Sequence, residues 1–240
     1  MANVLIGYSA CPLTRQAFEA QGHNVWTCDL LPARDGSPNH FKQDVREVLT
    51  AYAWDFAVLH PMCTYLTVSA AWAYNDPDYE KYPGVGYHQK DKPGTLVGAA
   101  RRAAQAEELG NFRWLLNLPF PCAIENPARS YVCTAIRKPD QAIQPYEFGD
   151  DASKITGLWL THGTPKLVPT CRVAGRIVEH NGKRVERWAN QTDSGQNNLS
   201  PGADRWLERS ATYPGIAAAM GAQWGAWLNN SAHHAISGRT

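Results

Sequence analysis

The first sixty residues alternate between short apolar runs and amphipathic segments, and this alternation limits the possible folds more than any other feature. Residues 3–8 (NVLIGY), 24–30 (NVWTCDL) and 54–60 (WDFAVLH) have the near-continuous apolar character of strands buried on both faces. Residues 13–23 and 44–52 lie between them and have the apolar spacing of helices. A β-α-β-α-β order predicts an α/β fold with a doubly wound parallel sheet.

The rest of the chain predicts two further strands and two helices. Residues 96–117 predict a helix, residues 122–127 (CAIENP) and 154–163 (KITGLWLTHG) predict strands, and residues 213–228 predict a closing helix. We expect one domain over residues 1–228, since a second full domain does not fit in 240 residues, and a flexible tail over 229–240.

Two segments have the composition of functional insertions. Residues 73–95 contain Pro, Gly, four Tyr and several charges, and a loop of this length in a compact domain is more often functional than idle. Residues 172–188 predict a β-hairpin, because alternating strands flank Asn181-Gly182, the pair that a type I′ turn favours. The alternative for each is a solvated surface loop or an edge hairpin that only caps the sheet.

Composition narrows the cellular setting. The net charge of +1 neither requires nor excludes nucleic acid, because a basic face can lie within a neutral total. The sequence has no apolar run long enough for a membrane span, and the N-terminus has no signal-peptide pattern. Six cysteines without CxxC spacing predict reduced thiols and no metal site. We therefore expect a cytoplasmic protein with no membrane partner.

Three reactive side chains lie at or just after the ends of predicted strands. Cys63 follows the strand at 54–60, Glu125 lies in the CAIENP strand, and Asp29 ends the second strand. Ligands of such sheets bind beyond the carboxyl ends of the strands. A cysteine and an acid suit covalent addition to an electron-poor ring, because sulfur attacks a carbon while the acid protonates a ring nitrogen. Each residue alone has a structural alternative: an inert buried cysteine, a turn and a helix cap.

Several motifs occur in an order that resembles the DNA cytosine-5 methyltransferases, especially the short members found in bacteriophages. They are LIGYSACPLTRQAFEAQGHNVWTCDLLP (5–32), QDVREV (43–48), HPMCTYLTVS (60–69), IENPARS (124–130), SKITGLWL (153–160) and RSATYPGIAAAMGAQWG (209–225). The chain departs from the family pattern at Ala10, Pro12 and Met62, and has Lys154 and Thr156 where two arginines are common. The resemblance implies a Rossmann-like methyltransferase sheet with a small hairpin insertion.

The resemblance also implies roles for individual residues. Cys63 would be the nucleophile toward C6 of cytosine, Glu125 in its protonated form would act at N3, Asn126 would hold the Glu125 segment, and Lys154 would contact ring or phosphate oxygens. S-adenosylmethionine would be the cofactor. Its implied binding residues are Tyr8, Ser9, Asp29, Leu30, Asp44, Val45 and Pro61.

Double-stranded DNA would be the macromolecular partner, with the target cytosine flipped out of the duplex, since a stacked base cannot be reached. The implied DNA-binding residues are Lys81, Lys90, Lys92, Arg129, Arg176, Lys183, Arg184 and Arg187. The segment 171–209 is the only room for a recognition insertion, so we expect a short target sequence or little specificity. A bacteriophage protein of this kind would act in the cytoplasm of the bacterial host.

Three alternatives remain open from the sequence. A methyltransferase acting on an exocyclic amine would carry an Asp/Asn-Pro-Pro-aromatic loop where this chain has HPMCTY, and would tolerate Cys63→Ser. A relative that transfers a different one-carbon or carboxymethyl group from a modified cofactor would fit the altered loop at Ala10 and Pro12. A non-catalytic DNA-binding relative would need neither Cys63 nor Glu125.

Overall fold

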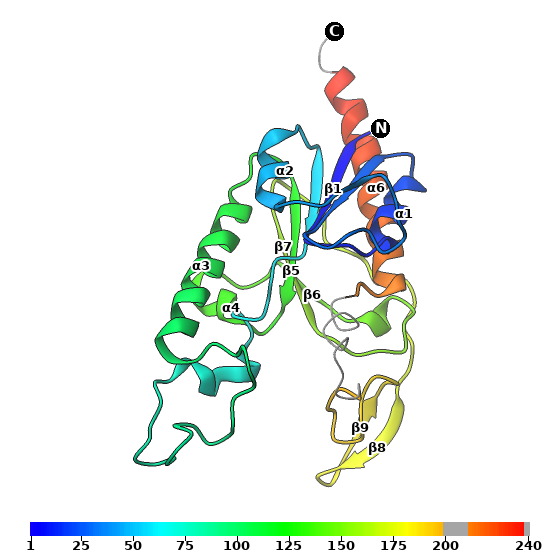
Figure 1. Ribbon diagram of the computed structural model, residues 1–240. Coiled ribbons are helices and arrows are strands. Elements are labelled where there is room, and N and C mark those ends of the chain that lie inside the picture. The colour runs from blue at the N-terminus through cyan, green and yellow to red at the C-terminus, as the bar shows by residue number, and fades with distance from the viewer. Residues whose placement is uncertain (199–210, 238–240) are drawn as a thin grey trace.

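A seven-stranded sheet forms the centre of the molecule (Figure 1). The computed structural model describes residues 1–198 and 211–237. The strands are β1 (Asn3–Gly7), β2 (Asn24–Cys28), β3 (His40–Phe41), β4 (Phe56–Leu59), β5 (Cys122–Pro127), β6 (Gln141–Ile143) and β7 (Thr156–Leu160). Their order in the sheet is β3-β2-β1-β4-β5-β7-β6. Neighbouring strands are parallel except that β7 is antiparallel to both β5 and β6. The predicted Rossmann-like α/β sheet is confirmed; the sequence did not predict the reversed strand.

Helices cover both faces of the sheet, as the doubly wound topology requires (Figure 1). One face carries α1 (Leu13–Glu19) and α6 (Pro214–Ser237), which pack against each other. The other carries α2 (Val45–Ala51), α3 (Gly98–Leu116) and α4 (Tyr131–Ala135). Short 3₁₀ helices occur at η1 (Val68–Tyr74) and η2 (Pro145–Glu147). Helix α6 continues to Ser237, beyond residue 228 where the sequence pattern predicted the helix to end.

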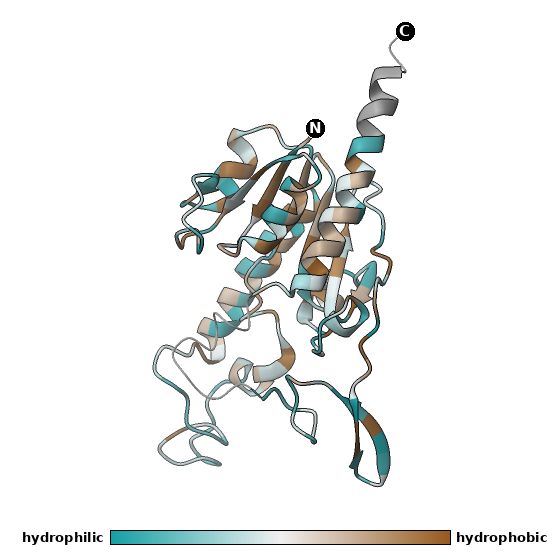
Figure 2. Ribbon diagram, turned by 90° about the vertical axis from the view of Figure 1, so that its right-hand side faces the viewer, coloured by the Kyte–Doolittle hydropathy of each residue, from teal (hydrophilic) through white to brown (hydrophobic). Residues whose placement is uncertain are grey.

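Two hydrophobic clusters hold these layers together, one on each face of the sheet. Successive residues of β1 point to opposite faces, so Val4 and Ile6 belong to the cluster of α1 and α6, and Leu5 to the cluster of α2 and α3. Trp224 fills the first cluster and Phe112 the second, both without solvent exposure. Brown, apolar colour accordingly concentrates on the central strands in Figure 2. Burial on both faces explains why these strands read as apolar runs.

A glycine allows α6 to approach α1 closely. A Cβ atom built on Gly221 would lie 2.5 Å from the carbonyl carbon and oxygen of Ala17. Only a residue without a side chain fits that contact, because backbone atoms cannot move away as a flexible side chain does.

The predicted hairpin forms a separate two-stranded sheet from β8 (Arg176–His180) and β9 (Lys183–Arg187). Asn181 and Gly182 at its turn have φ angles of 51° and 70°, the left-handed pair that a type I′ turn needs. Residues 199–209 of the predicted recognition insertion, and the first two residues of the last motif, lie outside the described residues. Within the described part, no helix is long and apolar enough to cross a membrane.

Candidate active site at the carboxyl edge of the sheet

The parallel strands β2, β1, β4 and β5 end at the same edge of the sheet. Their register pairs Gly7 with Cys28 and with Leu59, and Leu59 with Ile124. The residues that come next in the chain (Tyr8, Asp29, His60 and Glu125) therefore line this edge in neighbouring positions. This is the edge at which ligands bind in open α/β sheets.

His60 and Glu125 form a pair at the centre of the edge. The Nδ1 atom of His60 lies in short hydrogen-bond contact with Oε2 of Glu125, and the two side chains are 14% and 20% exposed. The backbone N–H of His60 donates to the carbonyl oxygen of Gly7 at 3.0 Å, which fixes His60 to the end of β1. His60 begins the HPMCTYLTVS motif, but the sequence analysis assigned it no role. Its position directly after a central strand was the feature that could have identified it.

The environment of Glu125 holds its pKa at about 2, below the ordinary value of 4.5. Burial acts to raise this pKa, but the charge and hydrogen bond of His60 outweigh it, together with the Lys154 charge and a hydrogen bond from Thr156. Glu125 is therefore a carboxylate in the resting protein, whereas the family resemblance implies a protonated carboxyl.

Cys63 lies on a tight turn that begins three residues after His60. Its side chain is exposed. Its carbonyl oxygen accepts the N–H groups of Leu66 at 3.0 Å and Thr67 at 2.9 Å, so the turn starts at the cysteine itself. Pro61, on the approach to the turn, is buried, and the following Met62 is 51% exposed. The structure thus presents the thiol at the carboxyl edge and does not bury it in the core.

Asn126 links the Glu125 strand to the cysteine turn. Its side chain is 2% exposed, and Nδ2 donates to the carbonyl oxygen of Pro61 at 3.3 Å. The Oδ1 atom is buried and accepts no hydrogen bond from the described residues. Asn126 therefore contacts both segments that carry the candidate nucleophile and acid.

Arg101 holds the segment after Cys63 against α3, and the sequence did not single it out. The guanidinium donates to the carbonyl oxygens of Thr64 at 3.1 Å and Leu96 at 3.3 Å. It also lies over the rings of Tyr65 and Tyr74, 5.4 and 4.7 Å from their centroids. Although charged, Arg101 is only 4% exposed. Its place on the core-facing side of a predicted helix is the signal that could have identified it.

Lys154 and Thr156 approach Glu125 from the antiparallel strand. Register pairs Asn126 with Gly157 and Pro127 with Thr156, so the start of β7 lies beside the end of β5. The backbone N–H of Lys154 donates to Oε1 of Gln144 at 2.9 Å. Glu125, Lys154 and Thr156 line one side of a small pocket, and Tyr213 and Met220 lie on the other side.

The β1–β2 half of the edge carries the predicted cofactor-binding residues. Tyr8, with φ 58°, hydrogen-bonds through its hydroxyl to Asn111 of α3, and burial raises the pKa of this phenol. Ser9 Oγ accepts the N–H of Cys11 at 3.3 Å. Asp29 is half-buried, its Oδ1 accepts the N–H of Leu31 at 2.9 Å, and the adjacent Leu30 is 73% exposed.

Asp44 and Val45 lie at the start of α2, next in line along the same edge. Asp44 is exposed and caps the helix, since its Oδ1 accepts the N–H of Arg46 at 2.8 Å. Val45 is 3% exposed and packs in the core beneath the cap. The structure brings Tyr8, Asp29 and Asp44 to one edge, but gives each a local backbone or side-chain partner as well.

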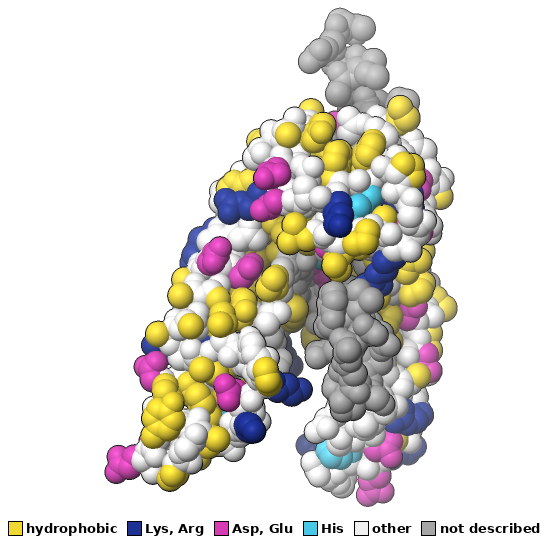
Figure 3. Space-filling view, in the orientation of Figure 1, with side chains coloured by type: hydrophobic (Ala, Val, Ile, Leu, Met, Phe, Trp, Pro, Cys, Tyr) yellow, Lys and Arg dark blue, Asp and Glu magenta, His cyan; other side chains and the backbone are white. Residues whose placement is uncertain are grey.

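Two projections extend beyond the carboxyl edge on opposite sides (Figure 1). One is the loop between η1 and α3, and the other is the β8–β9 hairpin. The space-filling view is open between them, and Lys and Arg side chains lie along the inner margin of the left-hand projection (Figure 3). Lys81, Lys90 and Lys92 are exposed on the loop, and Arg129 is exposed after β5.

The hairpin is braced at its base and open at its tip. Trp188 stacks on Tyr146 with ring centroids 4.0 Å apart and an interplanar angle of 7°. Arg176 donates to the carbonyl oxygens of Trp188 and Gln191 and to Asp193, and Arg187 donates to the Asp193 carbonyl oxygen. Lys183 and Arg184 are exposed at the tip. Two of the four basic hairpin residues predicted to bind DNA therefore hold the hairpin's own backbone.

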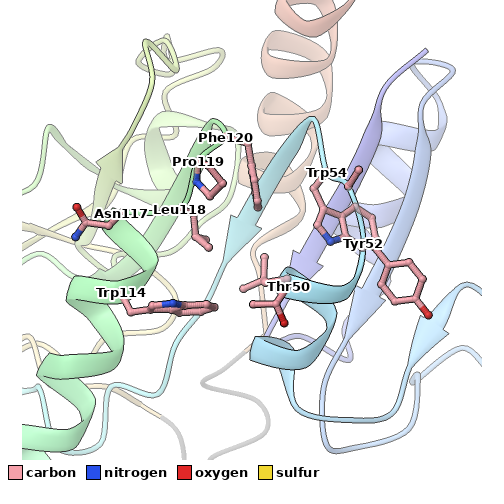
Figure 4. Close-up of a pocket in the computed structure, with 10 residues that line it drawn as sticks. Thr50, Tyr52, Trp54, Trp114, Asn117, Leu118, Pro119 and Phe120 are labelled. Carbon is pink, nitrogen blue, oxygen red and sulfur yellow. The ribbon is translucent and has the colours of Figure 1, made fainter.

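An aromatic pocket of about 520 Å³ lies at the opposite end of the sheet (Figure 4). Its walls come from the end of α2, the end of α3 and the segments that enter β4 and β5. The lining side chains include Tyr52, Trp54, Trp114 and Phe120. Because these residues precede the central strands, the pocket is remote from the carboxyl edge and does not belong to the candidate site.

Two methyltransferases are among the solved structures to which this chain shows a likeness. No protein-family profile matches the chain, and no curated protein matches it. A prophage-encoded E. coli protein assigned as a DNA modification methyltransferase is 11% identical, with a TM-score of 0.37 over 67% of this chain and 46% of that one. The S. pombe Dnmt2 methyltransferase is 16% identical, with a TM-score of 0.35 over 66% of this chain and 48% of that one. The matched region spans about half the length of each.

Proposed function

We propose that this protein transfers a methyl group from S-adenosylmethionine to C5 of cytosine in DNA, through a covalent bond between Cys63 and C6 of the base. The observation that carries the proposal is the meeting of the exposed Cys63 side chain and the partly buried His60–Glu125 pair at adjacent strand ends. β4 leads into the Cys63 turn, β5 contains Glu125, and Asn126 bonds the two segments together. A nucleophile and an acid held this way suit addition to a pyrimidine ring.

The chain's own residues perform the steps around the methyl transfer. The Cys63 sulfur forms a bond to C6, the electrons of the C5–C6 double bond move into the ring, and Glu125 gives a proton to N3. S-adenosylmethionine supplies the methyl group to C5 when bound. C5 then loses its proton to a base, the C5–C6 double bond re-forms, and Cys63 leaves as a thiolate while N3 returns its proton to Glu125.

The donor set of the β1–β2 half fits S-adenosylmethionine. Asp29 offers a carboxylate at the end of β2, where ribose hydroxyls bind in sheets of this type. Leu30 beside it is an exposed apolar side chain, of the kind on which an adenine ring packs. Asp44 presents a second carboxylate, which is exposed, to an exocyclic amino group. Tyr8, Ser9, Val45 and Pro61 complete the surface we assign to the cofactor.

DNA fits the two projections beside the carboxyl edge. A target base must leave the duplex to reach Cys63, at a cost of a few kcal/mol. The loop with Lys81, Lys90 and Lys92 and the hairpin tip with Lys183 and Arg184 offer phosphate contacts on either side of that base. A two-stranded ribbon is also narrow enough to enter a major groove. The limited size of the hairpin favours a short target sequence or little specificity.

The test is nucleoside mass spectrometry of DNA incubated with the protein and S-adenosylmethionine. We expect 5-methylcytosine with the wild type and with Cys171→Ala, which removes an exposed cysteine outside the site. Cys63→Ala should give none. DNA with 5-fluorocytosine should trap a denaturant-resistant complex with the wild type and with Cys171→Ala but not with Cys63→Ala, because fluorine is not lost as a proton is.

Each other outcome has a distinct meaning. Methylation that survives in Cys63→Ala would show amine chemistry and overturn the covalent mechanism. A base with a larger added mass would show transfer of a different group, the alternative that the altered Ala10-Cys11-Pro12 loop favours. No modified base, with DNA binding intact, would leave a non-catalytic DNA-binding protein.

A further inference from the structure

The proposed chemistry needs a proton that Glu125 does not hold. A carboxyl with a pKa of about 2 is protonated in about one molecule in 10⁵ at pH 7. Protonation of N3 by Glu125 alone would thus begin from a very rare state. The hydrogen in the short contact between His60 and Glu125 lies closest to the carboxylate, and it belongs to Nδ1 because an ionised carboxylate only accepts.

We propose that His60 is the positioning residue of Glu125, and that its imidazolium holds the proton which Glu125 delivers to N3 of the target cytosine. This inference rests on the proposed function. His60 does not touch the base; it acts through the carboxyl group. Its own position is fixed, because its backbone donates to Gly7 and its ring packs at a strand end with 14% of the side chain exposed.

The flipped base, when it covers the His60–Glu125 pair, drives the transfer of the proton from His60 to Glu125. The pair keeps partial contact with water in the resting protein, since 20% of the Glu125 side chain is exposed. A flipped base stacked against the pair removes that water, and loss of water disfavours two charges relative to two neutral groups. The ion pair of imidazolium and carboxylate then becomes neutral imidazole and carboxylic acid.

The surroundings of the other ring nitrogen, Nε2, also favour transfer of the proton from His60 to Glu125. Nε2 of His60 is buried and makes no hydrogen bond to any of the described residues. An imidazolium there has an N–H group that lacks an acceptor, so its positive charge is poorly solvated. Once Nδ1 gives up its proton, the ring is neutral and that cost falls. The site therefore stabilises the imidazolium through Glu125 alone.

The proton balance closes over one cycle. The Nδ1–H bond breaks and its electron pair stays on nitrogen, while an O–H bond forms on Glu125. That O–H bond breaks when N3 takes the proton, as the bond between Cys63 and C6 forms. When Cys63 leaves, the N3–H bond breaks, and the proton returns through Glu125 to Nδ1. Cys63, Lys154 and Tyr213 are the other ionisable groups named at this site.

His60→Asn separates proton storage from positioning. The Asn side-chain N–H group takes the place of Nδ1–H and keeps a hydrogen bond to Glu125, but it has no acidic proton to give. We expect the single-turnover rate to fall at least about 100-fold at pH 8, in the range of general acid catalysis. The ratio of wild-type to variant rate should shrink toward about tenfold at pH 6, because Glu125 then takes its proton from solvent more often.

A purely structural role of His60 would lower the rate by one constant factor at every pH. Rates within threefold of each other, or a ratio that does not change with pH, would overturn the proposal. An inactive wild type would overturn the proposed function itself, which makes the two failures distinguishable.

Nitrogen NMR of ¹⁵N-histidine-labelled wild-type protein tests the resting state without any turnover. At pH 6 we expect both ring nitrogens of His60 to carry hydrogen, with the Nδ1 hydrogen in a strong hydrogen bond that disappears in Glu125→Ala. A neutral ring, with hydrogen on only one of its two nitrogens, would overturn the proposal. This measurement also decides the matter if His60→Asn does not fold.

Discussion

The β4–β5 half of the carboxyl edge is joined by side chains from distant parts of the chain, whereas the two carboxylates of the β1–β2 half bond to backbone groups close to them in the chain. His60 meets Glu125 across 65 positions, and Asn126 reaches Pro61 across the same separation. In the other half, Asp29 and Asp44 each accept an N–H group two residues ahead. The first half fixes its geometry before any ligand arrives. The second keeps one exposed carboxylate, Asp44, and one half-buried carboxylate, Asp29, whose local bonds leave room for a ligand.

This difference makes the two halves respond differently to substitution. In the β4–β5 half, a substitution should alter stability and reaction rate together, because the same contacts hold the fold and the reacting groups. In the β1–β2 half, a substitution can weaken cofactor binding without an equal loss of stability. Three sets of substitutions, in order of decreasing expected effect, test this contrast.

The largest effect is expected from Glu125→Gln. The folded-state pKa of Glu125 lies below its ordinary value, so its ion pair stabilises the protein above about pH 4.5 and is lost as the pH falls to about 2. A shift of this size corresponds to about 3 kcal/mol. Urea unfolding should show that the wild type loses about this much more stability than Glu125→Gln between pH 7 and pH 2. Parallel curves for the two proteins would contradict the pairing.

A smaller effect is expected from Arg101→Met, for which Arg102 provides a matched control. Arg101 is buried and donates to two backbone carbonyl groups, which its loss would leave without donors, at a cost of about 2–3 kcal/mol. Arg102 pairs with Asp76, but its side chain is 45% exposed, so Arg102→Met should cost under about 1 kcal/mol. Chemical unfolding measures both.

The rate at which a thiol reagent modifies Cys63 gives a second comparison of Arg101→Met with Arg102→Met. It should change in Arg101→Met, because Thr64 beside Cys63 loses its anchor, and stay constant in Arg102→Met. Equal behaviour of the two variants would remove Arg101 from the site.

The smallest effect is expected in the β1–β2 half. Asp29→Ala should weaken S-adenosylmethionine binding about tenfold, or about 1.4 kcal/mol, with the melting temperature unchanged. Asp44→Ala should also lower stability by about 1 kcal/mol, because it removes a helix cap. Calorimetric titration and thermal unfolding separate the two. Unchanged affinity in Asp29→Ala would place the cofactor elsewhere.

Local sequence patterns predicted much of the architecture. The apolar runs predicted β1, β2 and β4, and the Asn181-Gly182 pair predicted the hairpin turn that its positive φ angles confirm. Two short strands, β3 and β6, were not predicted, because two or three residues carry no detectable period. The reversed direction of β7 was not predicted either, since strand pairing depends on partners far along the chain.

The sequence by itself determined which residues end the central strands, because periodicity and burial are local properties of a chain. It thus identified Cys63, Glu125 and Asp29 as candidates. Only the tertiary structure decided which of them meet. It paired Glu125 with His60, joined Asn126 to Pro61, and buried Arg101 against the cysteine turn. These contacts link elements through sheet order and helix packing, whose free energy comes from non-local burial, so no local pattern encodes them.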